Sequence, residues 1–275
     1  MRYKTILVHV DDTPQAATTI ALAARLALGS DAHLLGVATT GVSRFFYQDA
    51  GADLARTVLA PYIDERLRAA EALLDRFEAL ATGAGVRSFE RRLIDDETGA
   101  ALALASRYAD LVVLGQPDPA QPIPPGGVDL PAYTLFGGAH PVLIVPCIQA
   151  DAGAVRRILL AWNGSAQAAR AAGAALPLLR AAEAVVVAVA GTHAEPAQAE
   201  HALLAWLARH EVDAELVADA TTGDVGDCLL SLAADRASDL LVMGGYGHAR
   251  LRELLLGGAT RTVLRTMTIP VLMAH

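Results

Sequence analysis

The sequence contains the same pattern of residues twice. Residues 6–13 (ILVHVDDT) align with residues 158–165 (ILLAWNGS) at an offset of 158 − 6 = 152 positions, and each is an apolar run that ends in polar, turn-forming residues. Residues 110–115 (DLVVLG) align with residues 239–244 (DLLVMG) at an offset of 239 − 110 = 129 positions. Matched segments of this kind indicate an internal repeat, so we expect two copies of one structural unit.

The last apolar segment of each copy repeats as well. Residues 141–146 (PVLIVP) align with residues 270–273 (PVLM) at the same offset of 129 positions. These matches predict a first domain over residues 1–150 and a second domain over residues 154–275, with a short linker between them.

The first copy is longer than the second. Because the offset falls from 152 to 129 along the chain, 152 − 129 = 23 extra residues precede its later strands, and we place them within residues 41–76. Charged and apolar residues are mixed at helical spacing over residues 65–78, which indicates an amphipathic helix that covers the sheet.

Strand and helix patterns alternate along each copy. In the second copy the expected elements, beginning with a strand, are residues 156–162, 165–181, 184–190, 196–210, 213–218, 225–236, 239–244, 258–267 and 270–274. This alternation predicts an α/β fold with two tandem open, parallel, Rossmann-like sheets and helices on both faces. The composition agrees, since 53% hydrophobic with only 5% aromatic residues suits parallel strands under Ala- and Leu-rich helices.

The net charge and the cysteine content limit which classes of binding partner and which cellular compartment we expect. A formal net charge of -8 argues against binding to nucleic acid or to anionic membranes. No apolar run reaches the about 18 residues that a membrane span needs, and the strand pattern at the N-terminus leaves no room for a signal peptide. Cys147 and Cys228 have no metal-ligand spacing, so we expect a cytoplasmic protein without a metal site.

A glycine-rich segment follows the fourth strand pattern of the second copy. Gly244 is followed by two residues and Gly247, then by nine residues and Gly257, and Gly258 opens the next helix pattern. Glycines allow close approach of the backbone to a ligand, and the N–H groups at a helix start attract an anion. Because the carboxyl ends of parallel strands meet at one edge, Asn163 should face the same crevice.

These features resemble the universal stress protein (UspA-like) family in its tandem two-domain form. The stretches ILLAWNGS, DLLVMGGYG and LLLGGATRTVLRTMTIPVLM support this resemblance, which extends over essentially the whole chain. The family's ATP-binding members have GxxGx9G followed by Ser or Thr, which matches Gly244, Gly247 and Gly257. The resemblance implies two adenine nucleotide alpha hydrolase-like domains that form an intramolecular pseudo-dimer, with residues 141–146 paired with residues 270–273.

The resemblance also implies a ligand. The second copy is expected to bind ATP, with or without Mg²⁺, or a related adenine nucleotide. The residues expected at the nucleotide are Ala161, Trp162, Asn163, Ala190, Met243, Gly244, Gly247, His248, Gly257, Gly258, Ala259 and Thr260. The family implies no catalytic residues and at most weak ATP hydrolysis, so we expect a regulatory stress-response protein that acts on an unidentified protein partner, as a monomer or as a homodimer.

Two positions of the second copy depart from the family's binding pattern. Gly258 stands where that pattern has Ser or Thr, and Thr260 offers a hydroxyl one turn away. Asn163 stands where these proteins usually have Asp, and an amide does not bind Mg²⁺ as a carboxylate does. We therefore expect weaker affinity or an altered metal dependence.

The first copy departs further. Gly115 is followed closely by Pro117 and Asp118, and proline has no N–H for a phosphate while a carboxylate repels one, which predicts a degenerate site. Asp11 is expected to serve in a turn or at a helix start, whereas for Asn163 the turn and the ligand interpretations both stay open.

Other functions have less support. The glycine segment has no P-loop lysine, Ser165 lies outside a GxSxG motif, and the histidines form no HExxH motif. His248 is either a phosphate contact or a solvated loop residue. The alternative to nucleotide binding is a ligand-free interaction scaffold with a relic site, and a true enzyme that uses the same crevice is a third hypothesis.

Overall fold

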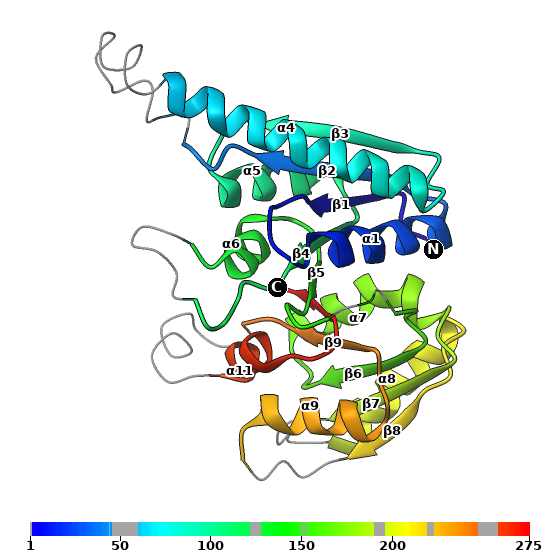
Figure 1. The fold of residues 1–275 in the computed structure, drawn as a ribbon. Helices are drawn as coiled ribbons and strands as arrows, with labels where there is room; N and C mark the ends of the chain where they lie inside the picture. Colours follow the sequence, from blue (N-terminus) through cyan, green and yellow to red (C-terminus); the bar gives the residue numbers. More distant parts are fainter. Residues whose placement is uncertain are drawn as a thin grey trace. The chain divides into compact units, whose positions relative to one another are not determined.

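The computed structural model describes residues 2–43, 45, 60–121, 128–149, 151, 153–189, 196–218, 223–246 and 258–275. The chain divides into two compact units (Figure 1). We call Arg2–His140 the first unit, and Pro141–Gln149 together with Gly153–His275 the second unit. The last strand of the first copy thus belongs to the second unit.

The first unit alternates strands and helices. Its elements are β1 (Thr5–His9), α1 (Ala16–Ser30), β2 (His33–Thr39), α4 (Ala60–Gly83), β3 (Phe89–Ile94), α5 (Thr98–Ala105), the 3₁₀ helix η2 (Ser106–Tyr108), β4 (Leu111–Gly115) and α6 (Leu130–Gly137). The strands are parallel, in the order β3-β2-β1-β4. Helices α1 and α4 pack on each other and on the strands, and α5 packs on α6.

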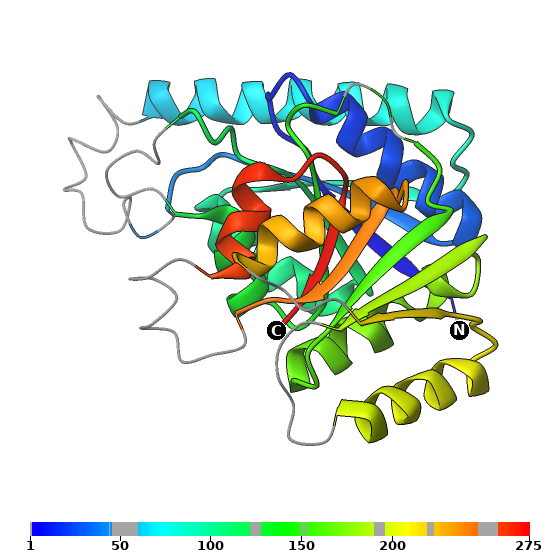
Figure 2. The same cartoon turned by 90° about the horizontal axis from the view of Figure 1, so that it is seen from below.

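The second unit repeats this arrangement and has two more strands. Its elements are β5 (Val142–Val145), β6 (Arg157–Trp162), α7 (Ala166–Leu179), β7 (Ala184–Val189), α8 (Pro196–Arg209), β8 (Glu215–Ala218), α9 (Val225–Asp235), β9 (Leu240–Gly244), α11 (Ala259–Thr266) and β10 (Val271–Ala274). The strand order is β5-β10-β9-β6-β7-β8. Helices α7 and α8 cover one face of these strands, and α9 and α11 cover the other (Figure 2).

The structure confirms the predicted α/β architecture. Each expected element of the second copy is present, and its ends differ from the prediction by at most two residues. The predicted pairing of the two last strands is also confirmed, because β5 runs antiparallel to β10, with Val142 opposite Met273 and Ile144 opposite Val271.

The central strands are buried on both faces, as a parallel sheet between helix layers requires. In β4 every residue from Leu111 to Leu114 has an exposed fraction of 0%, and in β6 Leu159 and Leu160 are also at 0%. These strands therefore read as continuous apolar runs, without the alternation of a half-exposed strand.

An aspartate before the fourth strand of each copy fixes the start of the first strand. The Asp110 carboxylate accepts hydrogen bonds from the N–H groups of Lys4 and Thr5 at 2.6 and 2.9 Å. In the second copy, Asp239 accepts from the N–H groups of Arg156 and Arg157 at 2.9 and 3.0 Å. The repeated Asp-Leu dipeptide of the sequence thus marks the same backbone contact in both units.

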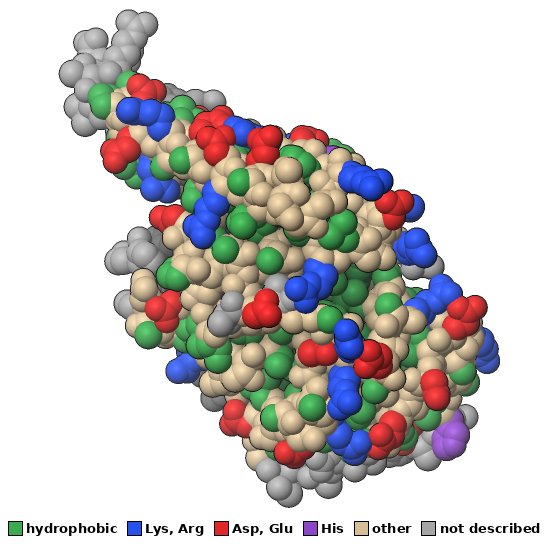
Figure 3. Space-filling model, turned by 45° about the vertical axis from the view of Figure 1, so that its right-hand side comes forward, with side chains coloured by type: hydrophobic (Ala, Val, Ile, Leu, Met, Phe, Trp, Pro, Cys, Tyr) green, Lys and Arg blue, Asp and Glu red, His purple; other side chains and the backbone are tan. Residues whose placement is uncertain are grey.

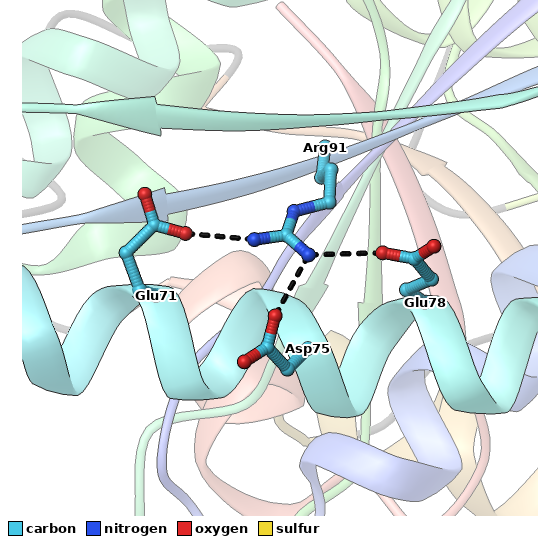
Figure 4. A network of polar contacts seen from close by, with 4 residues as sticks. All are labelled: Glu71, Asp75, Glu78 and Arg91. Atoms are coloured by element: carbon cyan, nitrogen blue, oxygen red, sulfur yellow. Dashed lines mark hydrogen bonds and ion pairs between the residues drawn. The ribbon is translucent and has the colours of Figure 1, made fainter.

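Helix α4 is held to the edge strand β3 by an ion-pair cluster (Figure 4). Arg91 on β3 pairs with Glu71, Asp75 and Glu78 of α4, at N–O distances of 2.8, 2.7 and 2.9 Å. The spacing of the three acidic residues places them on one helix face. The opposite face is apolar and buries Leu74 and Phe77 among others, which confirms the predicted amphipathic helix.

Replacing Arg91 by glutamine should lower the free energy of unfolding by a small, salt-dependent amount. The substitution leaves three carboxylates on one helix face without their cation, and salt screens the repulsion because all four side chains are exposed. Urea denaturation of the wild type and the variant, at low salt and at about 1 M salt, measures this loss of unfolding free energy. A loss of equal size at both salt concentrations would show that packing, and not charge, is responsible.

The described surface mixes charges of both signs. Figure 3 shows acidic and basic side chains interspersed over the face in view. No helix in the described ranges is long and apolar enough to cross a membrane.

Candidate functional site

The order of the strands in the second unit creates a topological switch point between β6 and β9. From β6 the chain proceeds to β7 and β8 on one side, and then returns to β9 and β10 on the other. The helices that follow β6 and β9, α7 and α11, therefore lie on opposite faces (Figure 2). In open α/β sheets, ligands bind in the crevice that such a divergence leaves at the carboxyl ends of the strands.

The turn after β6 is built by Asn163. Its Oδ1 accepts hydrogen bonds from the Ser165 N–H at 3.1 Å and from the Ser165 hydroxyl at 2.6 Å. The Ser165 hydroxyl oxygen in turn accepts from the Ala168 N–H at 3.1 Å and caps α7. Because Oδ1 faces Ser165, the Nδ2 donors of the Asn163 amide point away from the turn.

The first unit forms the same turn with a carboxylate. Asp11 Oδ1 accepts from the Thr13 N–H at 3.2 Å and from the Thr13 hydroxyl at 2.6 Å. This agrees with the turn role predicted for Asp11. Asn163 retains the turn of Asp11 while it adds donors and removes a negative charge.

Gly244 brings the end of β9 against the N-terminus of α7. A Cβ atom at this position would lie 2.6 Å from the Ala168 backbone nitrogen and 2.9 Å from the Gln167 Cβ. Its counterpart Gly115 has room, because a Cβ there would be 3.6 Å from the nearest side-chain atom, on Thr19. The glycine in the second unit is therefore required for packing, and the one in the first unit is not.

Hydrogen bonds hold the chain where it leaves β9. The Gly245 N–H donates to the Ala274 carbonyl at 2.9 Å. The Gly245 carbonyl lies 3.1 Å from His275 Nδ1, which must carry the hydrogen since a carbonyl only accepts. The Tyr246 N–H donates to Thr260 Oγ1 at 3.2 Å.

The start of α11 has no capping side chain on its N-cap residue. Its N-cap residue is Gly258, which has no side chain to accept from the N–H groups of the first helical turn. In the first unit the corresponding helix α6 is capped by Asp129, whose Oδ1 accepts from the Ala132 N–H at 3.2 Å. A carboxylate thus occupies the position in the first unit that an anionic ligand would need.

Several residues predicted for the site lie at this edge of the second unit. Trp162 and Gly244 end strands there, Asn163 lies in the turn after β6, and Gly258 is the N-cap residue of α11. Thr260, in the first turn of α11, has an exposed fraction of only 4%. The side chains of Ala161 and Met243, with exposed fractions of 7% and 5%, are buried, and Ala259 is half-buried in the first turn of α11. The predicted residues outside the described ranges are Ala190, Gly247, His248 and Gly257.

One polar atom at this edge has no partner in the described part of the chain. The Trp162 indole Nε1 is buried and makes no hydrogen bond to a described residue. The same position of the first copy is Val10, which has no polar side-chain atom.

The corresponding edge of the first unit is occupied by acidic groups. His9 Nδ1 lies 3.6 Å from Asp11 Oδ2, and His9 has an exposed fraction of 8%. Burial lowers the pKa of His9, while the charges of Asp11 and Asp12 oppose this shift. Asp118 accepts from the Ala120 N–H at 2.9 Å. Within the described ranges, no three His, Cys, Asp or Glu side chains are grouped to hold a metal ion.

The buried His9 should make the protein less stable in mild acid. Since its pKa in the folded protein is below the ordinary 6.5, the unfolded chain binds more protons once the pH falls through 6.5. Stability should then drop by up to about 1.4 kcal/mol per pH unit. Urea denaturation between pH 7.5 and 5 should show this slope in the wild type and a shallower slope in His9→Gln. Equal slopes would contradict it.

The comparisons with known proteins agree with the motifs. A family model described as the universal stress protein family matches residues 154–275. A curated universal stress protein of Synechocystis is 30% identical over 120 residues, which are 43% of this chain and 42% of that protein. The match thus spans less than half the length of that relative.

A solved structure has the same fold. The chain superposes on a universal stress protein from Archaeoglobus fulgidus with a TM-score of 0.78 and 15% identity, over 98% of this chain and 95% of that chain. A weaker match, with a TM-score of 0.38 and 17% identity over 52% of this chain and 98% of that chain, is a universal stress protein from the same organism in complex with dAMP. Residues 154–275 therefore belong to the universal stress protein family, and the chain as a whole has the fold of a universal stress protein.

Proposed function

We propose that the second unit binds an adenine nucleotide, ATP in the first instance, in the crevice between the carboxyl ends of β6 and β9. The observation that supports this most strongly is the N-cap of α11. Gly258 leaves the N–H groups of the first turn without a capping side chain, and the helix dipole adds partial positive charge there. Phosphate oxygens are the natural acceptors for such groups.

The turn after β6 supports the same ligand. The Nδ2 donors of Asn163 face away from Ser165 and add hydrogen-bond donors where the first unit has the Asp11 carboxylate. An amide does not repel phosphate, and it is a poorer Mg²⁺ ligand than a carboxylate. ATP affinity should therefore change little when Mg²⁺ is removed.

The choice of adenine rests on the family resemblance. Gly244, Gly247 and Gly257 match the spacing of the family's ATP-binding members. The first unit lacks that spacing and caps α6 with Asp129, so the proposal assigns one nucleotide to each chain.

The proposed role is regulatory. Nucleotide occupancy would change a surface that a protein partner recognises, which requires the partner to bind the two states with different affinity. The proposal assigns no catalytic residue, and it places the protein in the cytoplasm.

A ligand-free interaction scaffold is the second candidate function. It is favoured by the fact that Asn163 Oδ1 and Thr260 Oγ1 already accept hydrogen bonds from the protein itself. Under this alternative the crevice is a relic, and the stability of the protein does not respond to ATP.

Substituting Gly258 by aspartate separates the two candidates. The new carboxylate would cap α11 as Asp129 caps α6, so the fold should be as stable as the wild type or slightly more so. ATP at 100 times its dissociation constant should stabilise the wild type by about 2.7 kcal/mol and leave Gly258→Asp unchanged. Thermal denaturation of the two proteins, with and without ATP, measures their stability and the stabilisation by ATP. Equal stabilisation of the two proteins would refute the assigned phosphate position.

A further inference from the structure

One hydrogen bond connects the end of β9 to the first turn of α11. The Tyr246 N–H donates to Thr260 Oγ1 at 3.2 Å, across 14 positions of the sequence. We call this contact the latch. It joins the two residues that flank positions 247–259 of the sequence.

The residues next to the latch are themselves fixed by hydrogen bonds and by the backbone conformation. Just before it, Gly245 is bonded at both its N–H and its carbonyl to the end of the chain, at Ala274 and His275. Tyr246 has φ of +54°, a left-handed conformation that a residue with a side chain rarely adopts. Thr260 is buried, with an exposed fraction of 4%. The Thr260 hydroxyl is therefore directed at the backbone of Tyr246 and is not on the protein surface.

The first copy shows that the fold does not need the latch. At the offset of 129 positions, Tyr246 corresponds to Pro117, which has no N–H, and Thr260 corresponds to Pro131, which has no hydroxyl. His275 corresponds to Pro146. Helix α6 nevertheless forms with the same length as α11. The donor and the acceptor are absent together from the copy whose helix start is capped by its own carboxylate.

We infer that Thr260 is a positioning residue of the nucleotide site, which orients the start of α11 toward the phosphates through the backbone of Tyr246. This inference rests on the proposed function. It differs from a direct contact between the Thr260 hydroxyl and the nucleotide, because the hydroxyl acts on the protein backbone. The latch should affect the phosphates, which face the start of α11, and not the nucleoside.

The test compares ATP with adenosine on three proteins. Thr260→Val keeps the shape of the side chain and removes the acceptor, and Thr260→Ser keeps the hydroxyl. We expect Thr260→Val to weaken ATP binding about tenfold, with adenosine binding unchanged, and Thr260→Ser to bind ATP as the wild type does. Calorimetric titration gives the affinities, and thermal denaturation confirms that each variant is folded.

Thr262→Val is the matched control. This threonine lies in the same helix, but its hydroxyl donates to Asp224 Oδ2 at 3.1 Å and takes no part in the latch. ATP affinity should not change in this variant. An equal loss of ATP and adenosine affinity in Thr260→Val, or no loss of either, would overturn the inference while the proposed function stands. A wild-type chain that binds no ATP would overturn both.

Discussion

Gly244→Ala is expected to lower the free energy of unfolding by about 1–3 kcal/mol and to abolish nucleotide binding. The added methyl group would lie 2.6 Å from the Ala168 nitrogen, so the end of β9 and the N-terminus of α7 must move apart. A backbone atom cannot turn away as a flexible side chain can. Since this displacement occurs at the switch point, it also separates the two turns that are proposed to hold the ligand.

The control for this variant is Gly115→Ala in the first unit. A Cβ there would have only ordinary contacts, 3.6 Å to Thr19 Oγ1 and 3.9 Å to Asp11 Oδ2. Its stability should stay within about 0.5 kcal/mol of the wild type, with ATP binding unchanged. Chemical denaturation of both variants measures the change in unfolding free energy, and ATP titration measures the change in affinity. If Gly244→Ala bound ATP as tightly as Gly115→Ala, the proposed crevice would be wrong.

Phe77→Ala is expected to destabilise the first unit by about 3–5 kcal/mol. Phe77 on α4 has an exposed fraction of 0%, and its ring packs edge-to-face on Phe89 with centroids 6.0 Å apart. Gly36 on β2 makes room for it, because a Cβ at that position would lie 2.5 Å from the ring. Removing the ring leaves a cavity between α4 and the sheet.

Tyr62→Ala provides the comparison on the same helix. Tyr62 has an exposed fraction of 51%, and its loss should change stability by no more than about 0.5 kcal/mol. Urea denaturation of the two variants measures the difference. Similar small losses in both would mean that α4 contributes little to the core of the first unit.

The internal repeat predicted the fold well because it constrains both copies at once. The element bounds of the second copy follow from short apolar runs between turn residues such as Asn163 and Gly244. The repeat does not predict which of the two units the last strand of each copy packs against. Pro141–Gln149 lies in the second unit, where its strand β5 forms antiparallel hydrogen bonds with β10.

The candidate site was predicted less completely. Local spacing indicated the turn at Asn163 and the helix start at Gly258. The hydrogen bonds of Tyr246 and His275 each join a backbone group to a side chain far away in the sequence, so no motif identifies them. The signal that could have found them is the presence of proline at all three corresponding positions of the first copy.

The most direct measurement is calorimetric titration of the purified, ligand-free chain with ATP, once with Mg²⁺ and once with a chelator. We expect saturable binding of one nucleotide per chain, little dependence on Mg²⁺, and no binding by Gly258→Asp. Absence of heat at millimolar ATP, or two equivalent sites per chain, would contradict it.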